Sequence, residues 1–153
     1  MKKSLPILGA CGFALAAVLT PASAQQENAD GTIEAVVTDY VAAWGEPNAV
    51  KRRQLLDKVW SPSGTYVDPS AQVQGLVQLT EHIGAAQKTM PAGIQLSRTS
   101  AVDMHHHLIR FTWKITLSDG SNYLEGIDFG EVDESGRLRS ITGFFGPTKS
   151  LAR

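Results

Sequence analysis

The stretch that decides the fold covers residues 122–146 and reads NYLEGIDFGEVDESGRLRSITGFFG. Two strand-like runs meet there at residues 133–136, a sequence of turn-forming residues, and together they predict a long β-hairpin. Asp128 stands in the middle of the first run, with Gly126 and Gly130 at the neighbouring positions of the same face. This pattern predicts a carboxylate with open space beside it. If that face is covered, the carboxylate needs a special environment, because burying an unpaired charge is costly.

The chain before this hairpin also contains strand-like sequence. Residues 94–103 form an extended run, residues 104–107 are expected to be its turn, and Asp-Gly at residues 119–120 marks another tight turn. Between these turns, apolar and polar residues alternate with a period of two, which is typical of a half-buried strand. The apolar members of this strand are Ile109, Phe111, Trp113, Ile115 and Leu117.

Helical periodicity is found in the N-terminal half. Apolar residues recur at helical spacing in residues 32–45, 48–60 and 75–90. The second helix is expected to end at residues 61–64, Ser-Pro-Ser-Gly, and residues 65–68 are expected to be extended. Three helices followed by a meander of strands predict an α+β fold. We expect a cone-shaped barrel, with three N-terminal helices packed on a curved antiparallel sheet of four to six strands.

The N-terminus is typical of a cleaved secretory signal. Two lysines precede an apolar run at residues 5–19, and Ala22-Ser23-Ala24 supplies the small residues of a cleavage site. We expect cleavage after Ala24 and a periplasmic or secreted protein. The alternative is lipidation at Cys11, because residues 8–11 resemble a lipidation box. Few apolar residues precede Cys11, and this favours ordinary cleavage.

Removal of the signal at residues 1–24 leaves one domain. The sequence predicts a flexible lead-in at residues 25–31, the domain at residues 32–148 and a tail at residues 149–153. Loss of two lysines takes the formal net charge from −1 to −3. A weakly acidic chain without a basic surplus is not expected to bind nucleic acid, or membrane after signal cleavage. The basic triplet at residues 51–53 is interpreted as the solvent-exposed face of a helix.

A cone of this type encloses a cavity between its helices and its sheet. We expect its lining to include Trp44, Trp60, Tyr66, His82, Phe111, Trp113 and Phe144. Three polar side chains also stand in apolar surroundings, namely Tyr40, Asp68 and Asp128. Each has an ordinary structural explanation, because Asp before Pro often starts a turn and a helical Tyr is often part of the core. Their occurrence as a set is what suggests chemistry.

The histidine run at residues 105–107 suggests a metal site at first sight. Adjacent residues of an extended segment point to opposite faces, and no Asp, Glu or Cys is spaced to complete a tetrahedral ligand set nearby. We interpret these residues as turn or strand-end histidines and predict no metal site. Motifs for a nucleophile elbow, a phosphate loop or a dinucleotide are absent from the sequence, so no cofactor is expected.

Four stretches resemble the nuclear transport factor 2-like superfamily, in its SnoaL-like and ketosteroid isomerase-like branch. They are AVVTDYVAAW, GTYVDPSAQVQG, AVDMHHHLIRFTW and EGIDFGEVDESGRLRSITGFFG, and the resemblance spans residues 33–147. It implies that Asp68 is a proton-transferring base and that Asp128 is the protonated carboxyl of an oxyanion hole. It further implies that Tyr40 is the second donor of that hole. The resemblance also implies a homodimer formed through the outer face of the sheet.

Three functions are compatible with these residues, and the enzyme status stays open among them. The first is an exported isomerase or cyclase that needs no cofactor and acts on a small apolar molecule. The second is a non-catalytic binder of such a molecule. The third is a structural or interaction dimer whose core is filled. The sequence does not identify a substrate.

Overall fold

The structure, a computed structural model, describes residues 21–147 and 149–151. Most of the predicted signal, including Cys11, lies outside the described residues. The helices are α1 (Pro21–Gly45), α2 (Ala49–Val59) and α3 (Gly75–Thr89). The strands are β1 (Trp60–Asp68), β2 (Ala71–Gln74), β3 (Gln95–Arg98), β4 (Asp103–His105), β5 (Leu108–Thr116), β6 (Asn122–Val132) and β7 (Leu138–Phe145). Within the described ranges, no helix has the length and apolarity needed to cross a membrane.

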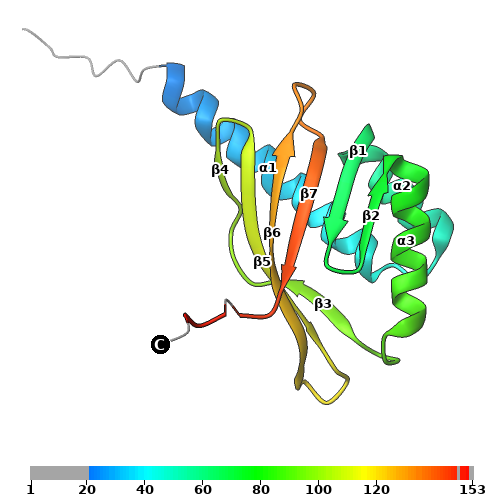
Figure 1. Cartoon of the computed structure of the whole chain (residues 1–153). Helices are drawn as coiled ribbons and strands as arrows, with labels where there is room; N and C mark the ends of the chain where they lie inside the picture. The colour runs from blue at the N-terminus through cyan, green and yellow to red at the C-terminus, as the bar shows by residue number, and fades with distance from the viewer. Residues whose placement is uncertain (1–20, 148, 152–153) are drawn as a thin grey trace, which may run out of the picture.

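The expected α+β architecture is confirmed. All strands belong to one seven-stranded sheet of order β2-β1-β7-β6-β5-β3, with β4 also paired to β5. Figure 1 shows α1 passing behind the strands, while α2 and α3 lie beside β1 and β2. The helices therefore cover one face of the curved sheet.

The sheet differs from the prediction in two respects, its seven strands instead of four to six and one pairing. It is mixed rather than antiparallel, because β1 runs parallel to β7. β1 also begins at Trp60, so residues 61–64, expected to end a helix, form strand with a register shift between Trp60 and Thr65. A bulged strand can accommodate Pro62. Gly64 is needed there because an added Cβ would lie 2.6 Å from the Trp60 indole nitrogen.

The long hairpin of residues 122–146 is confirmed. The Asp133 and Gly136 backbone N–H groups donate to the carbonyls of Arg137 and Asp133, at 2.8 and 2.9 Å. Gly136 has φ of +81°, a conformation that glycine adopts readily. The run at residues 94–103, by contrast, is divided between β3 and β4, and both pieces pair with β5. Its turn is only His106 and His107, both with positive φ.

The first helix is longer than expected. Residues 25–31, predicted as a lead-in, continue α1, which starts at Pro21. Proline is favoured in the first turn of a helix, and the Ala, Gln and Glu residues that follow are strong helix formers. The second helix is capped by Asn48, whose side-chain oxygen accepts the N–H groups of Val50 and Lys51.

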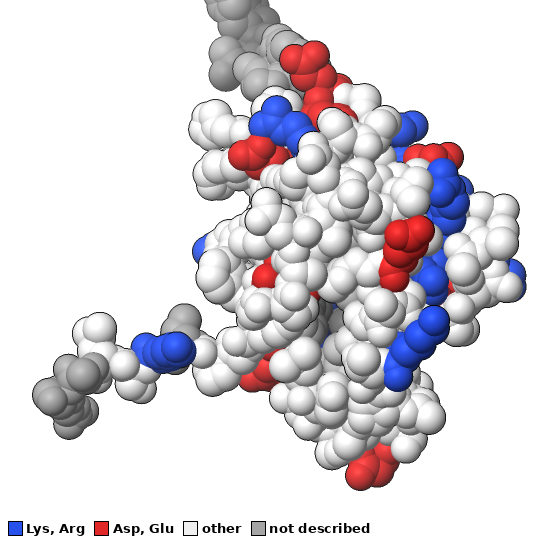
Figure 2. Space-filling model, turned by 45° about the vertical axis from the view of Figure 1, so that its right-hand side comes forward, with Lys and Arg blue, Asp and Glu red and all other residues white. Residues whose placement is uncertain are grey.

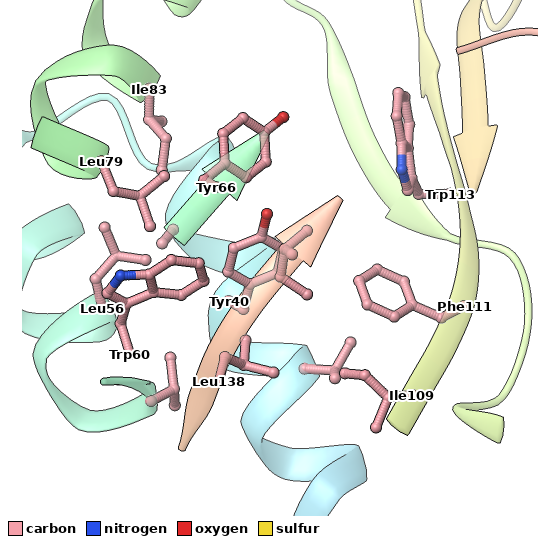
Figure 3. Close-up of a cluster of buried hydrophobic side chains, with 14 of the residues drawn as sticks. Tyr40, Leu56, Trp60, Tyr66, Leu79, Ile83, Ile109, Phe111, Trp113 and Leu138 are labelled. Carbon is pink, nitrogen blue, oxygen red and sulfur yellow. The ribbon is translucent and has the colours of Figure 1, made fainter. Parts of the chain in front are cut away.

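The core lies between α1, α2, α3 and the inner face of the sheet, and Figure 3 shows its aromatic centre. Tyr40 stacks on Trp60 with ring centres 6.0 Å apart and meets Phe111 edge to face.

Arg52 corrects the interpretation of the basic triplet. Lys51 and Arg53 are exposed, but Arg52 is buried and donates to the carbonyls of Thr80 and Glu46. A third hydrogen bond, of 2.8 Å, goes to the Gln87 side chain. The helical spacing of Arg52 and Leu56 places both on the buried side of α2.

Candidate functional site

A cavity of about 400 Å³ lies between the helices and the inner face of the sheet. Its lining is largely apolar, and its acidic residues are Asp68 and Asp128, with no Lys or Arg among the described residues that line it. On the protein surface, acidic and basic residues are interspersed over the face shown in Figure 2, and much of the middle of that face is uncharged. The fold therefore gathers two carboxylates in a cavity without a fixed positive charge.

The two aspartates reach this cavity from neighbouring parts of the sheet. Asp128 pairs with Phe111 on one side and with Gly143 on the other, and Asp68 ends the strand that runs beside β7. A Cβ added to Gly143 would lie 3.1 Å from Asp128 Oδ1 and 3.8 Å from the Cβ of Asp68. Gly143 thus provides the space in which the two carboxylates face the same cavity.

Asp68 is held as an ionised carboxylate. Its side chain is only 4% exposed. Oδ1 accepts hydrogen bonds from the Ser70 N–H, the Ser70 hydroxyl and the Ala71 N–H at 2.6, 2.7 and 2.8 Å. Oδ2 accepts a 2.8 Å bond from the Tyr66 hydroxyl. Burial raises the pKa of Asp68, but the hydrogen bonds from Ser70, Tyr66 and Ala71 outweigh it and hold this pKa below its usual value.

Asp128 has the opposite environment. It is 5% exposed, and its Oδ1 accepts a 2.8 Å hydrogen bond from the Trp113 indole N–H. Burial raises the pKa of Asp128 from 3.8 to about 6; the Trp113 bond lowers it, while the charge of Asp68 raises it. Asp128 therefore changes its protonation state near pH 6.

The space expected beside Asp128 is filled, which corrects the sequence interpretation. Trp113 pairs with Gly126, and a Cβ on that glycine would lie 2.5 Å from the indole ring. The ring passes over Gly126 to reach the carboxylate. At Gly130 the space is taken by Ile141 and Ile109. These glycines therefore serve packing and the support of Asp128.

Two tyrosines add hydroxyl groups. Tyr40 is 1% exposed and lines the cavity, and its hydroxyl has no hydrogen-bond partner among the described residues. In Figure 3 this hydroxyl points toward Tyr66. Burial raises the pKa of Tyr40 well above its usual value and the charge of Asp128 raises it further, although the nearby Trp44 side chain lowers it. Burial and the charge of Asp68 likewise raise the pKa of Tyr66. Both hydroxyls therefore keep their protons.

His82 lies at the edge of this group. The distance from His82 Nε2 to Asp68 Oδ2 is 3.6 Å, which is too long for a hydrogen bond. This nitrogen is buried and has no hydrogen-bond partner among the described residues. The imidazole packs against the rings of Trp44 and Tyr66, with centres 5.8 and 5.5 Å away.

Most of the expected lining residues line the cavity. These are Trp44, Tyr66, His82, Phe111 and Trp113, together with Tyr40, Asp68 and Asp128. Phe144 does not, because it lies on the outer face and is 56% exposed. Phe145 lines the cavity instead, since the pairing of Asp128 with Gly143 turns residues 143 and 145 inward. Trp60 is also outside the lining: it is 1% exposed and packs under Tyr40.

Sequence reasoning missed two hydrogen bonds of the site. It predicted Tyr66 and Trp113 only as aromatic lining of the cavity. In the structure the Tyr66 hydroxyl donates a hydrogen bond to Asp68, and the Trp113 indole N–H donates one to Asp128. The hydrogen bond between Tyr66 and Asp68 could have been predicted, because residues two positions apart in a strand lie on the same face.

The histidine turn does not reach this cavity. His105 and His106 are exposed, with Nδ1 atoms 3.4 Å apart. Across the described residues, no group of three or more His, Cys, Asp or Glu side chains is arranged to hold a metal ion.

Fold and site define a class of protein: an α+β cone with a mainly apolar cavity that contains two carboxylates and a buried hydroxyl. No protein-family model matches the chain, and no curated protein matches it. Solved structures do. A candidate isomerase of the SnoaL-like family from Agrobacterium tumefaciens superposes with a TM-score of 0.71 and 28% identity, over 76% of this chain and 99% of that chain.

Two more distant structures share the fold. A candidate polyketide cyclase from Sinorhizobium meliloti matches with a TM-score of 0.55 and 17% identity, over 71% of this chain and 92% of that one. A protein with a ketosteroid isomerase-like fold from Catenulispora acidiphila, in complex with trimethylamine, has a TM-score of 0.54 and 16% identity, over 71% and 82% of the two chains. The predicted resemblance to the nuclear transport factor 2-like superfamily, in its SnoaL-like branch, is confirmed by these solved structures.

Proposed function

We propose that this protein is an exported isomerase or cyclase that acts on a small, largely apolar carbonyl compound and needs no cofactor. The observation that carries the proposal is the pair of aspartates in one cavity, with the pKa of Asp68 lowered and that of Asp128 raised to about 6. Environments that move the pKa values of two acids in opposite directions assign one acid the role of base and the other the role of proton donor. The names of two solved neighbours, a candidate isomerase of the SnoaL-like family and a candidate polyketide cyclase, support the same reaction class.

In the proposed reaction, Asp68 removes a proton from the carbon next to the carbonyl group. The C–H bonding pair moves into the new carbon–carbon double bond, and the carbonyl electrons move to oxygen and form an enolate. The Tyr40 hydroxyl, which has no other partner, and the protonated form of Asp128 donate hydrogen bonds to that oxygen. Return of the proton to a different carbon gives an isomer. In a cyclisation, the enolate carbon attacks a second carbonyl group instead. The new carbon–carbon bond closes the ring, the electrons of that carbonyl's π bond move to its oxygen, and the resulting alkoxide takes the proton from Asp68.

The environment of Asp128 suits this role. A negative charge that develops beside a buried carboxyl favours its protonated form, so the enolate itself raises the pKa of Asp128 above about 6. Tyr40 also keeps its proton, since burial raises its pKa. Tyr40 is therefore a donor across the neutral range, whereas Asp128 donates in the protein molecules in which it is protonated, a fraction that grows as the pH falls through about 6.

A second function, non-catalytic binding, has one observation in its favour. Both oxygens of Asp68 already accept hydrogen bonds, and these lower its pKa. A carboxylate of lowered pKa is a weaker base. The trimethylamine complex of one neighbour provides an example of a small molecule bound by a protein of this fold.

Binding of 2-naphthol, a neutral phenol whose anion mimics an enolate, distinguishes these functions. We expect the Asp68→Asn variant to bind it more tightly, because the negative charge beside the oxyanion site is removed. Asp128→Leu should bind it more weakly, because a donor is lost. Asp128→Asn keeps a permanent donor, so its affinity should lose the change near pH 6 that the wild type shows. Glu125→Gln, exposed on the outer face of the same strand, is the matched control.

Naphthol fluorescence, followed from pH 4.5 to 8, provides the affinities. Equal affinity in the wild type and in the Asp68 and Asp128 variants would refute the enolate mechanism and leave the binder. Absence of naphthol binding would refute the site assignment for both. For catalysis itself, proton exchange of a bound ketone in deuterated buffer should be lost in Asp68→Asn.

Export is part of the proposal and has its own test. The chain produced with its natural N-terminus in a Gram-negative host should be recovered from the periplasm, with Gln25 as its first residue. A product that begins at an acylated Cys11 would establish lipidation instead. An uncleaved chain in the cytoplasm would refute export.

A further inference from the structure

A second cavity, of about 410 Å³, adjoins the first one. Trp44, Met90, Leu96 and Ile115 line both cavities. These four side chains lie between the two cavities, and we call them the partition. The second cavity continues from this partition toward the loop at residues 91–94, which joins α3 to β3.

The side chains of the partition come from the sheet on one side and from the helices on the other. Leu96 and Ile115 are cross-strand partners on β3 and β5, so they form one apolar surface under both cavities. Trp44 and Met90 cover it from α1 and from the C-cap of α3. Trp44 is held by ring contacts with Tyr40 and His82. Met90 is an unbranched, half-buried side chain, the type that adapts most easily to a change of shape.

The second cavity suits an apolar group. Among its described lining residues, Gln87 alone has an amide, acidic or basic side chain. That amide is engaged within the protein: its nitrogen donates to the carbonyls of Trp44 and Glu46 at 2.7 and 3.1 Å, and its oxygen accepts from Arg52. A polar ligand group would therefore find no uncommitted amide or charged side chain there, and its polar partners would be backbone groups at the exposed rim formed by Pro47, Pro91 and Gly93.

We propose that the ligand of this protein has two parts: a carbonyl head bound at the aspartates and an apolar tail that enters the second cavity past Met90. The proposal rests on the proposed function for the position of the head. The ligand class is accordingly an elongated apolar ketone or phenol with its polar group at one end. Cavities of about 400 Å³ each, used together, match the size range of ordinary small-molecule sites.

A series of 2-naphthols with ethyl, butyl and hexyl groups at the 6-position tests the tail. We expect the affinity for the exported wild-type protein to rise along the series, up to about fourfold for each buried methylene group. Ala92 lines the second cavity and not the first, so Ala92→Trp should fill it. In this variant the ratio of hexylnaphthol to naphthol affinity should fall toward one. Val77→Trp, exposed on α3, is the matched control and should keep the wild-type ratio.

The outcomes separate the tail from the chemistry of the head. Naphthol that binds and responds to Asp68→Asn, with no gain from longer tails, would overturn the tail site and leave the proposed function intact. Hexylnaphthol that responds to Ala92→Trp, and not to Asp68→Asn, would support the tail site and overturn the enolate site. A tail effect unchanged by Ala92→Trp would place the tail elsewhere and overturn the proposal.

Discussion

Replacement of Asp128 by asparagine should make the folded protein more stable at neutral pH. Asp128 has a pKa of about 6 in the folded state and an ordinary value of 3.8 for an exposed aspartate. Below pH 3.8 the carboxyl is protonated in both the folded and the unfolded chain. As the pH rises, the unfolded chain releases this proton first, so the free energy of unfolding falls until the pH passes about 6.

The size of this loss follows from the two pKa values. At 1.36 kcal/mol for each tenfold change, a pKa raised from 3.8 to about 6 corresponds to about 3 kcal/mol. Asparagine does not ionise, and its side-chain oxygen can keep the 2.8 Å hydrogen bond from Trp113. The stability difference between Asp128→Asn and wild type should therefore grow by about 3 kcal/mol from pH 3.5 to 7.

Urea unfolding followed by tryptophan fluorescence at several pH values measures this difference. Comparison across pH removes any constant effect of the substitution on packing. The outer-face variant Glu125→Gln should show no such growth with pH. A difference between Asp128→Asn and wild type that is independent of pH would refute the raised pKa. A variant that loses stability above pH 6 would show that the Asp128 carboxylate is a structural anion.

Three further predictions concern other parts of the molecule. Gly84→Ala places a Cβ 2.6 Å from the Arg52 guanidinium; this overpacking should cost about 1–3 kcal/mol in urea unfolding and exceed the helix propensity gain of about 1 kcal/mol. Tyr66→Phe removes a hydrogen bond that lowers the pKa of Asp68, so the acidic limb of the pH profile of activity, or of naphthol binding, should move to higher pH; an unchanged limb would exclude Asp68 from that limb. The homodimer implied by the family resemblance would use the exposed outer face, so Phe144→Lys should convert dimer to monomer in sedimentation, whereas a wild-type monomer would contradict the prediction.

The sequence predicted the local parts of the fold well. The hairpin of residues 122–146 and the helix from Gly75 have clear turn signals and periodicity, and both are present. The parallel pairing of β1 with β7 was not predicted, because it joins segments far apart in the chain and leaves no local pattern. Arg52 was misplaced for a different reason: its charge was weighed above its helical spacing to Leu56.

The site was predictable to a similar degree. Asp68 and Asp128 could be selected because acidic residues in apolar strands are unusual, and the structure brings both into one cavity. The choice between Phe144 and Phe145 depended on strand register, and a shift by one residue exchanges the two faces. The hydrogen bond from Trp113 depended on an aromatic ring that crosses Gly126, which requires the pairing of the two strands to be known.

The parallel pair of β1 and β7 also determines when the site can form. Asp68 and Asp128 come together beside Gly143, which belongs to the last strand of the chain. Contacts between residues so far apart in sequence make folding slow and place assembly late. A nascent chain that ends before residue 138 has both acids but lacks the strand that sets their spacing. If the chain crosses a membrane unfolded, its cavity is completed only when the C-terminal strand has arrived on the far side.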